Sequence, residues 1–361
     1  MKRIVSLMLF AAMLFSAACA AEFEVAGISK YGNAVLNVTA DTFEAMGFEL
    51  GDDVTVQAGE FSADMPYLDG FYVYTGEYLL RRTGDGELDV CISHGNFSEN
   101  AGVGLGDAVH ISVKEEGGSL ALQGTGALKY TDERADYESD EIFANFRMIT
   151  SGNIAPGRLY RAASPINNDR SRAAVSNKLI EAADIRTVMN MADSAESIAE
   201  HAAAEGFDSP YYMDLYAQGR VVALDMDVNF QSEDFSAKLV KGLSFLAGQE
   251  GPFLVHCNEG KDRAGFASAV ISALMGASAE EIAADYMASY ENYYHMDSEG
   301  DAERYALIMD GNIMQMLRHI AGIEKDAPLD GVDLAKAAEE YLIERGMETQ
   351  AIAQLRQKLS A

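Results

Sequence analysis

The segment VHCNEGKDRAG, residues 255–265, places an arginine six positions after a cysteine. The apolar run PFLVHC ends at Cys257, and AGFASAVISALM, which begins at Ala264, has the composition of a buried helix. Where a strand leads through a tight loop into a helix, backbone N–H groups converge and the helix dipole favours negative charge. The segment therefore predicts a phosphate-sized anion site with a cysteine at its base.

The residue types in this loop fit that chemistry. Gly260 lets the chain turn closely, and the planar fork of Arg263 can hold two phosphate oxygens at once. The same positive surroundings favour the thiolate form of Cys257, which is the nucleophilic form. A thiolate beneath a bound phosphate is placed for in-line attack and for a phosphocysteine intermediate. The alternative is a buried strand that ends in an ordinary turn.

HCNEGKDRAG resembles the signature loop of the protein tyrosine phosphatase superfamily, in which His-Cys, five residues and an arginine precede a helix. Its GKDR form is more similar to the bacterial atypical dual-specificity and lipid phosphatases than to the large receptor type. GRLYRAASP at 157–165, IRTVMNMADS and ADYMASY also fit that bacterial group. The resemblance therefore covers the chain from about 145 to 300.

The resemblance implies a role for each residue of the loop. Cys257 is expected to be the nucleophile and Arg263 the phosphate clamp, and His256 to help set the ionisation of the thiolate through hydrogen bonds. Lys261 would add positive charge at the rim, unless it is a solvated side chain, and Arg161 is either near the substrate or structural. The expected substrate-binding residues are His256, Asn258, Glu259, Gly260, Lys261, Ala264 and Arg161.

Two features depart from the family pattern. Ala264 stands where the family usually has Ser or Thr, whose hydroxyl stabilises the departing thiolate, so slower hydrolysis of the phosphoenzyme is expected. The chain contains no Trp, so the usual Trp-Pro-Asp loop that supplies the general acid is absent. The candidates are Asp227 and Asp225 in VVALDMDVNF, then Asp262 in the loop and Asp193 after TVMNM, with Asp227 ranked first.

Composition limits the partners. The formal net charge of -30 argues against a nucleic-acid or anionic-membrane surface, because both need a basic footprint. His94 and His110 lie in runs without the cysteine or carboxylate pattern of a metal site, so we expect no metal and no cofactor. The expected partner is a phosphorylated substrate: a phosphoprotein, a phosphoinositide or an inositol phosphate.

The first twenty residues have the pattern of a secretory signal. Lys2 and Arg3 precede the apolar run IVSLMLFAAMLF, and small residues at 18–20 offer a cleavage site. This predicts a secreted or extracytoplasmic protein, with a lipid anchor on Cys19 as the less favoured alternative. No other segment is long and apolar enough to be expected to cross a membrane.

The chain between 21 and 125 reads as short β-type runs broken by Gly and Asp, which predicts a small β-barrel or sandwich. ISKYGNAVLNV followed by GFELGDDVTV weakly resembles the C-terminal β-barrel domain of S-adenosyl-methionine hydrolases and halogenases. An accessory or binding domain is the favoured interpretation. Residues 126–149 are charged and predict a linker or lead-in.

From 150 to 361 strands alternate with helices, and the end of the chain is helical. This order predicts an α/β domain with a mainly parallel central sheet flanked by helices and a helical C-terminal extension. Ser278 and Glu281 have the spacing of a capping box. Together these features predict a secreted cysteine-dependent phosphatase of the protein tyrosine or dual-specificity type. The alternatives are a phosphoinositide or inositol-phosphate phosphatase, a phosphate-binding pseudophosphatase, and a sulfur carrier of the rhodanese kind.

Overall fold

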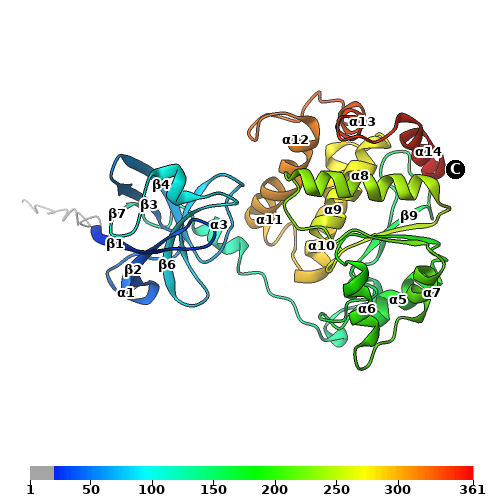
Figure 1. Cartoon of the computed structure of the whole chain (residues 1–361), viewed down its shortest axis with the longest axis horizontal. Coiled ribbons are helices and arrows are strands. Elements are labelled where there is room, and N and C mark those ends of the chain that lie inside the picture. Colours follow the sequence, from blue (N-terminus) through cyan, green and yellow to red (C-terminus); the bar gives the residue numbers. More distant parts are fainter. Residues whose placement is uncertain (1–19, 361) are drawn as a thin grey trace, which may run out of the picture. The chain divides into compact units, whose positions relative to one another are not determined.

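The computed structural model describes residues 20–360, which form two compact units that divide between Ala127 and Leu128 (Figure 1). The predicted signal segment lies outside the described residues up to Cys19. Each unit has its own hydrophobic core. Between residues 20 and 360, no helix has the length and hydropathy needed to span a bilayer.

The first unit is a closed barrel whose strands follow the order β1-β2-β6-β5-β4-β3-β7. β4 and β5 run parallel, whereas the other neighbouring strands run antiparallel. The strands are β1 (Ala20–Ile28), β2 (Ala34–Thr39), β3 (Asp53–Ala58), β4 (Phe61–Leu68), β5 (Tyr78–Arg82), β6 (Glu87–Ile92) and β7 (Ala108–Glu115). Three short helices connect them: α1 (Ala40–Ala45), α2 (Phe97–Ala101) and α3 (Leu120–Thr125). The predicted small all-β domain is therefore confirmed, as a barrel.

Aromatic side chains fill one part of the barrel core. Phe43 of α1 stacks on Phe48 with ring centroids 3.9 Å apart, and Tyr67 of β4 meets Phe43 edge-on at 5.1 Å. Cys91 of β6 is fully buried and free, and burial raises the pKa of its thiol well above the ordinary value. Cys91 is therefore an inert core residue, as its place in LDVCIS predicted.

The second unit is built on a sheet with the order β11-β10-β12-β9-β8. The strands are β8 (Arg147–Ile149), β9 (Leu159–Ala162), β10 (Thr187–Asn190), β11 (Val221–Ala223) and β12 (Phe253–His256). β12 lies in the middle and pairs in parallel with β10 and β9, β10 pairs in parallel with β11, and β8 runs antiparallel to β9. Every residue of β10 and β12 is buried, because helices cover both faces of the sheet.

Alternate side chains of β12 pack into the two hydrophobic cores on opposite faces of the sheet. Phe253 and Val255 pack into the core formed with α8 (Glu233–Gly248), α9 (Asp262–Leu274), α10 (Ala279–Tyr294) and the C-terminal helices. Leu254 packs into the core formed with α5 (Ala173–Ala182), α6 (Ala195–Ala203) and α7 (Pro210–Ala217). Figure 1 shows α5 to α7 on one side of the sheet and the later helices on the other. The predicted α/β fold with flanking helices is confirmed.

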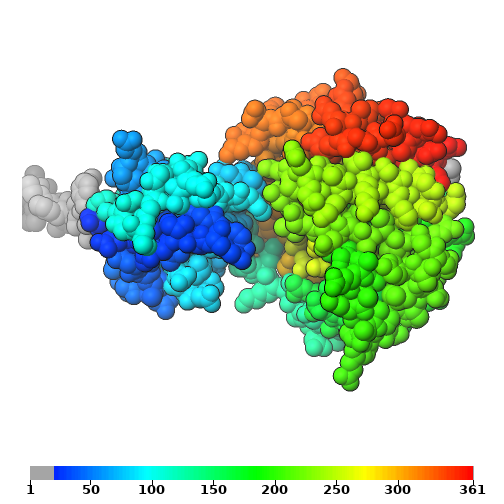
Figure 2. Space-filling view, in the orientation of Figure 1, coloured from blue at the N-terminus to red at the C-terminus, as the bar shows by residue number. Residues whose placement is uncertain are grey.

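The helices of this unit follow the predicted alternation. They are α4 (Asp140–Phe143), α5 (Ala173–Ala182), α6 (Ala195–Ala203), α7 (Pro210–Ala217), α8 (Glu233–Gly248), α9 (Asp262–Leu274), α10 (Ala279–Tyr294), α11 (Ala302–Met309), α12 (Gln315–Ala321), α13 (Leu334–Glu344) and α14 (Thr349–Ser360). α9 is buried from Ala264 to Leu274. In Figure 2 the C-terminal helices, orange to red, form a continuous layer along one border of this unit. The predicted capping box of Ser278 and Glu281 is present at the start of α10.

The charged segment before the sheet packs onto this unit from Leu128 onward. Arg172, which is 1% exposed, donates hydrogen bonds to the Thr131 carbonyl oxygen (2.9 Å) and the Tyr137 hydroxyl (3.0 Å) and forms an ion pair with Asp132 (2.7 Å). Residues 128–149 are therefore a lead-in to the second unit.

Candidate active site

Cys257 lies directly after the central strand β12, at the edge of the sheet where the parallel strands end. This edge is where ligands bind in α/β folds. Its side chain is free, and the residue is 3% exposed. Residues 258–261 then form a loop, and α9 begins at Asp262. The predicted strand, loop and helix are therefore present in the predicted order.

The carbonyl groups of the loop all accept hydrogen bonds from the surrounding protein. The contacts are Ser164 N to Asn258 O (3.0 Å), Asn145 Nδ2 to Glu259 O (2.9 Å), Arg161 Nε and Nη2 to Gly260 O (3.1 and 2.7 Å), and Arg161 Nη2 to Lys261 O (2.9 Å). Because the loop carbonyls point toward these protein donors, the backbone N–H groups of the loop are left for the other side of the loop.

Within residues 20–360, no hydrogen bond is donated by the backbone N–H groups of residues 258–261. The first turn of α9 adds further N–H groups that have no partner inside the helix. Together with the helix dipole, these amides form an anion cradle around Cys257. The cradle needs Gly260, whose φ is +68° and where a Cβ would lie 2.3 Å from the carbonyl atoms of Ala162.

Arg263 is in the first turn of α9, next to this cradle. Its Nη1 donates to the Met226 carbonyl oxygen at 2.8 Å, and its buried Nε has no partner among the described residues. A buried guanidinium nitrogen without an acceptor is costly unless a ligand supplies one. A phosphate oxygen in the cradle is a fitting acceptor.

His256 precedes the nucleophile and is completely buried. Its Nδ1 lies 3.3 Å from the Cys257 carbonyl oxygen, and its Nε2 has no partner in the described part of the chain. Burial lowers the pKa of His256 to about 4, so the imidazole is neutral near pH 7. Among residues 20–360, the imidazole ring makes one hydrogen bond, to the Cys257 backbone.

Lys261 is held within the protein at the edge of the loop. Its Nζ donates to the Tyr294 hydroxyl at 3.0 Å, lies 3.3 Å from Glu259 and stands 5.2 Å from the ring centres of Tyr290 and Tyr294. Burial works against its charge, but Asp262 and the neighbouring tyrosines and glutamate raise the pKa of Lys261 well above its ordinary value. Lys261 therefore carries a positive charge held in place beside the cradle and is not a freely solvated lysine.

Arg161 does not face the substrate, which corrects the prediction of a substrate-binding residue. It is completely buried in β9, and all three nitrogens of its guanidinium have partners: the carbonyls of Gly260 and Lys261, and Asp285 at 2.6 Å. Asp285 of α10 also pairs with Arg147 at 2.7 Å. Arg161 is therefore a positioning residue that holds the loop from behind.

No sequence pattern singles out Asp285 as part of the site. Burial pushes the pKa of this carboxyl upward, but Arg147 and Arg161 overcome that effect and hold it at about 2. The group is therefore a carboxylate at all ordinary pH values. It lies in ADYMASY, which matched the family, but nothing in those letters singles out its aspartate.

Comparisons with known proteins agree with this geometry. The model of the tyrosine phosphatase family matches residues 143–361, which is more than half of the chain. The chain belongs to the tyrosine phosphatase family. A search of curated proteins finds no match.

Two solved structures are similar over part of the chain. An uncharacterised conserved protein from Thermotoga maritima is 26% identical over 26% of this chain and 35% of its own length, with a TM-score of 0.24. The core catalytic domain of the PP-IP phosphatase SIW14 from S. cerevisiae, in complex with citrate, is 19% identical over 44% of this chain and 83% of its own, with a TM-score of 0.27. This chain thus spans about a third of the Thermotoga protein.

The structure divides the four candidates for the general acid into two pairs. Asp193 is buried and accepts hydrogen bonds from Asn190 (3.0 Å) and His201 (3.2 Å), so it has a structural role. The Asp262 carboxylate accepts from the Tyr286 hydroxyl at 3.2 Å at the start of α9. Both carboxylates are engaged in contacts that support the fold.

Asp225 and Asp227 flank Met226, whose carbonyl oxygen binds Arg263. Asp225 has a left-handed φ of +48°, and its carbonyl oxygen accepts from Lys238. Asp227 is exposed, accepts only from the Asn229 backbone at 2.7 Å among described residues, and is one peptide unit from the Arg263 contact. Asp225 is exposed as well, so the contact between Arg263 and Met226 brings two exposed carboxylates, Asp225 and Asp227, to this side of the site.

No hydroxyl side chain follows Arg263. Ala264 is completely buried at the start of α9. The neighbouring Gly265 lets α9 approach α10, because a Cβ there would lie 2.6 Å from the Tyr286 ring. No group of three or more His, Cys, Asp or Glu side chains able to hold a metal ion occurs in the part of the chain that the structure describes.

Proposed function

We propose that this protein is a secreted phosphatase that hydrolyses phosphomonoesters of the protein tyrosine or dual-specificity type through a phosphocysteine intermediate. The observation that carries the proposal is the cradle: loop carbonyls bound outward, free amides on residues 258–261, and Cys257 at its base beside Arg263. Such a site stabilises a doubly charged phosphate and its transition state at the same time.

In the first step the Cys257 sulfur attacks phosphorus while the bond from phosphorus to the ester oxygen breaks. The amides of the loop and the free edge of Arg263 hold the three other oxygens of the phosphoryl group. Asp227 donates its proton to the departing oxygen, which leaves as an alcohol or a phenol. His256 stays neutral and buried, so it takes no proton from Cys257 near pH 7.

In the second step water attacks phosphorus, the sulfur–phosphorus bond breaks and inorganic phosphate leaves. The Asp227 carboxylate takes the proton of that water, and Cys257 returns to the thiolate. Ala264 offers no hydroxyl to the departing sulfur, so the amides and the helix dipole carry that charge without it. We therefore infer that this step is slow relative to the first.

Hydrolysis of multiply phosphorylated substrates is the second candidate function, because the cations Lys261 and Arg170 lie on either side of Glu259. Lys261 lies 3.3 Å from one carboxylate oxygen and Arg170 3.3 Å from the other. Phosphoinositides and inositol phosphates have the additional anionic groups that such cations attract. The strongly acidic chain works in the opposite direction, so a single phosphomonoester remains the first choice.

Hydrolysis of para-nitrophenyl phosphate by the purified chain tests the proposal. We expect vanadate-sensitive turnover that is lost in Cys257→Ser, with a preference for phosphotyrosine peptides over phosphoinositides and inositol phosphates. Well-folded protein that binds vanadate but turns over no phosphomonoester would favour the pseudophosphatase alternative. A persulfide on Cys257 without phosphate release would favour the sulfur carrier. Recovery of the chain, cleaved after residue 20, outside the producing cell tests secretion; labelling of Cys19 by a fatty acid would show the lipid-anchored form.

A further inference from the structure

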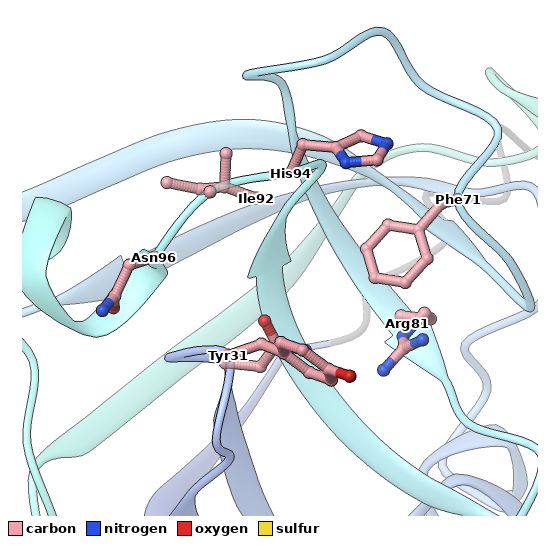
Figure 3. Close-up of a pocket in the computed structure, with 8 residues that line it drawn as sticks. Tyr31, Phe71, Arg81, Ile92, His94 and Asn96 are labelled. Atoms are coloured by element: carbon pink, nitrogen blue, oxygen red, sulfur yellow. The ribbon is translucent and has the colours of Figure 1, made fainter. Parts of the chain in front are cut away.

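The barrel unit contains a pocket of about 600 Å³ that the phosphatase chemistry does not use. The turn between β1 and β2, the segment between β4 and β5, strand β5 and the end of β6 contribute to it. It is lined by Tyr31, Asn33, Phe71, Arg81, Ile92, His94, Gly95 and Asn96 (Figure 3). This volume is within the usual range of small-molecule sites, roughly 300–1,000 Å³.

Two large aromatic side chains of this pocket are left open to solvent. Tyr31 is 68% exposed and Phe71 is 46% exposed. They come from different loops, and Figure 3 shows both rings bordering the same space. Exposed aromatic rings that gather at one concave site are typical of ligand stacking surfaces.

Cations accompany both rings. The Arg81 guanidinium lies over the Phe71 ring at 4.4 Å, and Lys30 lies over the Tyr31 ring at 4.7 Å. The lining adds His94 and includes no Asp or Glu, although the whole chain has 57 acidic and 27 basic residues. The pocket lining therefore includes a guanidinium and no carboxylate.

A buried carboxylate fixes Arg81 in place. Asp89, which is 2% exposed, accepts from Arg81 Nε at 3.0 Å and Nη2 at 2.7 Å, and from Asn33 at 3.1 Å. One edge of the guanidinium is thereby taken up, and Nη1 is left for a ligand. Because Arg81 is already ordered, a ligand that binds it does not need to immobilise a flexible side chain.

The turn after β6 shows that this region is constrained. His94 has a φ of +55°, a left-handed conformation that residues other than glycine seldom adopt. Such conformations gather at ligand sites, where the surrounding structure enforces them. His94 is exposed and stands on the same pocket as Arg81.

We propose that this pocket binds a small molecule that combines a planar aromatic ring with a carboxylate. The ring stacks on the Tyr31 and Phe71 side chains, and the carboxylate accepts hydrogen bonds from Arg81 Nη1 and from His94. A neutral aromatic ligand lacks the carboxylate contacts with Arg81 and His94. A saturated ring lacks the stacking on Tyr31 and Phe71. The barrel is thereby a ligand-binding domain attached to a phosphatase.

The test uses saturation-transfer NMR on the full chain with 2-naphthoate as the probe. Naphthalene-2-carboxamide and cyclohexanecarboxylate are the matched ligands that lack the charge and the aromatic ring. We expect 2-naphthoate to bind and both matched ligands to bind more weakly. Phe71→Ala and Arg81→Lys should each weaken 2-naphthoate by about tenfold. Leu105→Ala removes another exposed barrel side chain (73% exposed) that does not line the pocket, and should change nothing.

An aromatic carboxylate can also enter a phosphatase cradle, so binding is measured again in Arg263→Ala. Binding that persists in Arg263→Ala and weakens in Phe71→Ala supports the proposal. Binding lost in Arg263→Ala, equal binding of all three ligands, or no saturation transfer at millimolar probe would each overturn it. None of these results depends on turnover of a phosphomonoester, so the pocket and the proposed phosphatase activity fail independently.

Discussion

Replacing Asp285 by asparagine removes the charge that two buried arginines share. Arg161 is 0% exposed and Arg147 and Asp285 have side chains that are each 16% exposed, so water replaces the lost charge poorly. The substitution keeps the size and one acceptor oxygen of the side chain. It therefore tests whether the charge of Asp285 positions Arg161 and, through it, the Cys257 loop.

The size of the effect follows from these contacts. Breaking a buried ion pair by removing one partner costs about 3–5 kcal/mol. For a unit of this size that corresponds to a melting temperature lower by about 6–20 °C. A guanidinium that shifts by ~1 Å carries the carbonyls of Gly260 and Lys261 with it, and a displacement of that size in a catalytic site costs about a hundredfold in rate.

The assay measures kcat and KM for para-nitrophenyl phosphate at a temperature where circular dichroism shows the variant to be folded. We expect kcat/KM to fall about a hundredfold in Asp285→Asn, mainly in kcat. Asp132→Asn is the matched control, because Asp132 also pairs at 2.7 Å with a buried arginine, Arg172, that makes no hydrogen bond to the loop. Asp132→Asn should destabilise the fold and leave kcat/KM close to wild type.

Two results would refute this reasoning. If Asp285→Asn melts earlier but keeps the wild-type kcat/KM, the ion pairs stabilise the fold and do not position the loop. If Asp132→Asn loses activity to the same extent, the loss reflects general loosening of the unit and not the contact with Arg161.

Three further predictions concern the chemistry and the pH response. Asp227→Asn should reduce kcat for phenyl phosphate more than for para-nitrophenyl phosphate, whose leaving group needs less protonation, whereas Asp225→Asn should reduce neither; equal effects of both variants would exclude Asp227 as the acid. Ala264→Ser should shorten the slow phase after the burst of para-nitrophenol in stopped-flow experiments, and an unchanged burst would show that the missing hydroxyl does not limit turnover. His256 has a pKa of about 4 in the folded chain against 6.5 when unfolded, so stability is full above pH 6.5 and falls as the pH drops toward 4, by about 3 kcal/mol. The free energy of unfolding, measured by urea titration at each pH, should fall in this way in wild type and in the control His110→Gln, which changes an exposed histidine. It should fall less in His256→Gln. The same dependence on pH in all three proteins would refute the prediction.

The parts of the site that are contiguous in sequence could be predicted. Residues 253–274 carry a buried strand, a loop and a buried helix in one run, so Cys257 and Arg263 are placed by local geometry alone. The barrel and the α/β sheet could also be predicted, because apolar residues recur with strand or helix periodicity along each unit.

The residues that hold the loop from distant parts of the chain could not be predicted from the sequence. For Arg161 the sequence leaves two roles open, near the substrate or structural, because a strand places neighbouring residues on opposite faces and the sequence does not show which face meets the loop. Asp285 and Asn145 contact the loop only after α10 and the segment before β8 pack beside it. Lys261 depends in the same way on Tyr290 and Tyr294, whose spacing on α10 is equally typical of core packing.

The link between Arg263 and Met226 is a third feature of this kind. It brings the segment after β11, which carries Asp225 and Asp227, next to the cradle. The sequence shows only that Asp225 and Asp227 follow a strand, and most carboxylates at strand ends cap a turn.

Trapping the covalent intermediate tests the central claim most directly. Wild-type chain is mixed with para-nitrophenyl phosphate, quenched in acid within the burst phase, digested and analysed by mass spectrometry. The account predicts one phosphoryl group on the peptide that contains Cys257, absent from Cys257→Ser and longer-lived in wild type than in Ala264→Ser. Phosphate release at the full rate with no phosphoryl group on Cys257 at any quench time would contradict it.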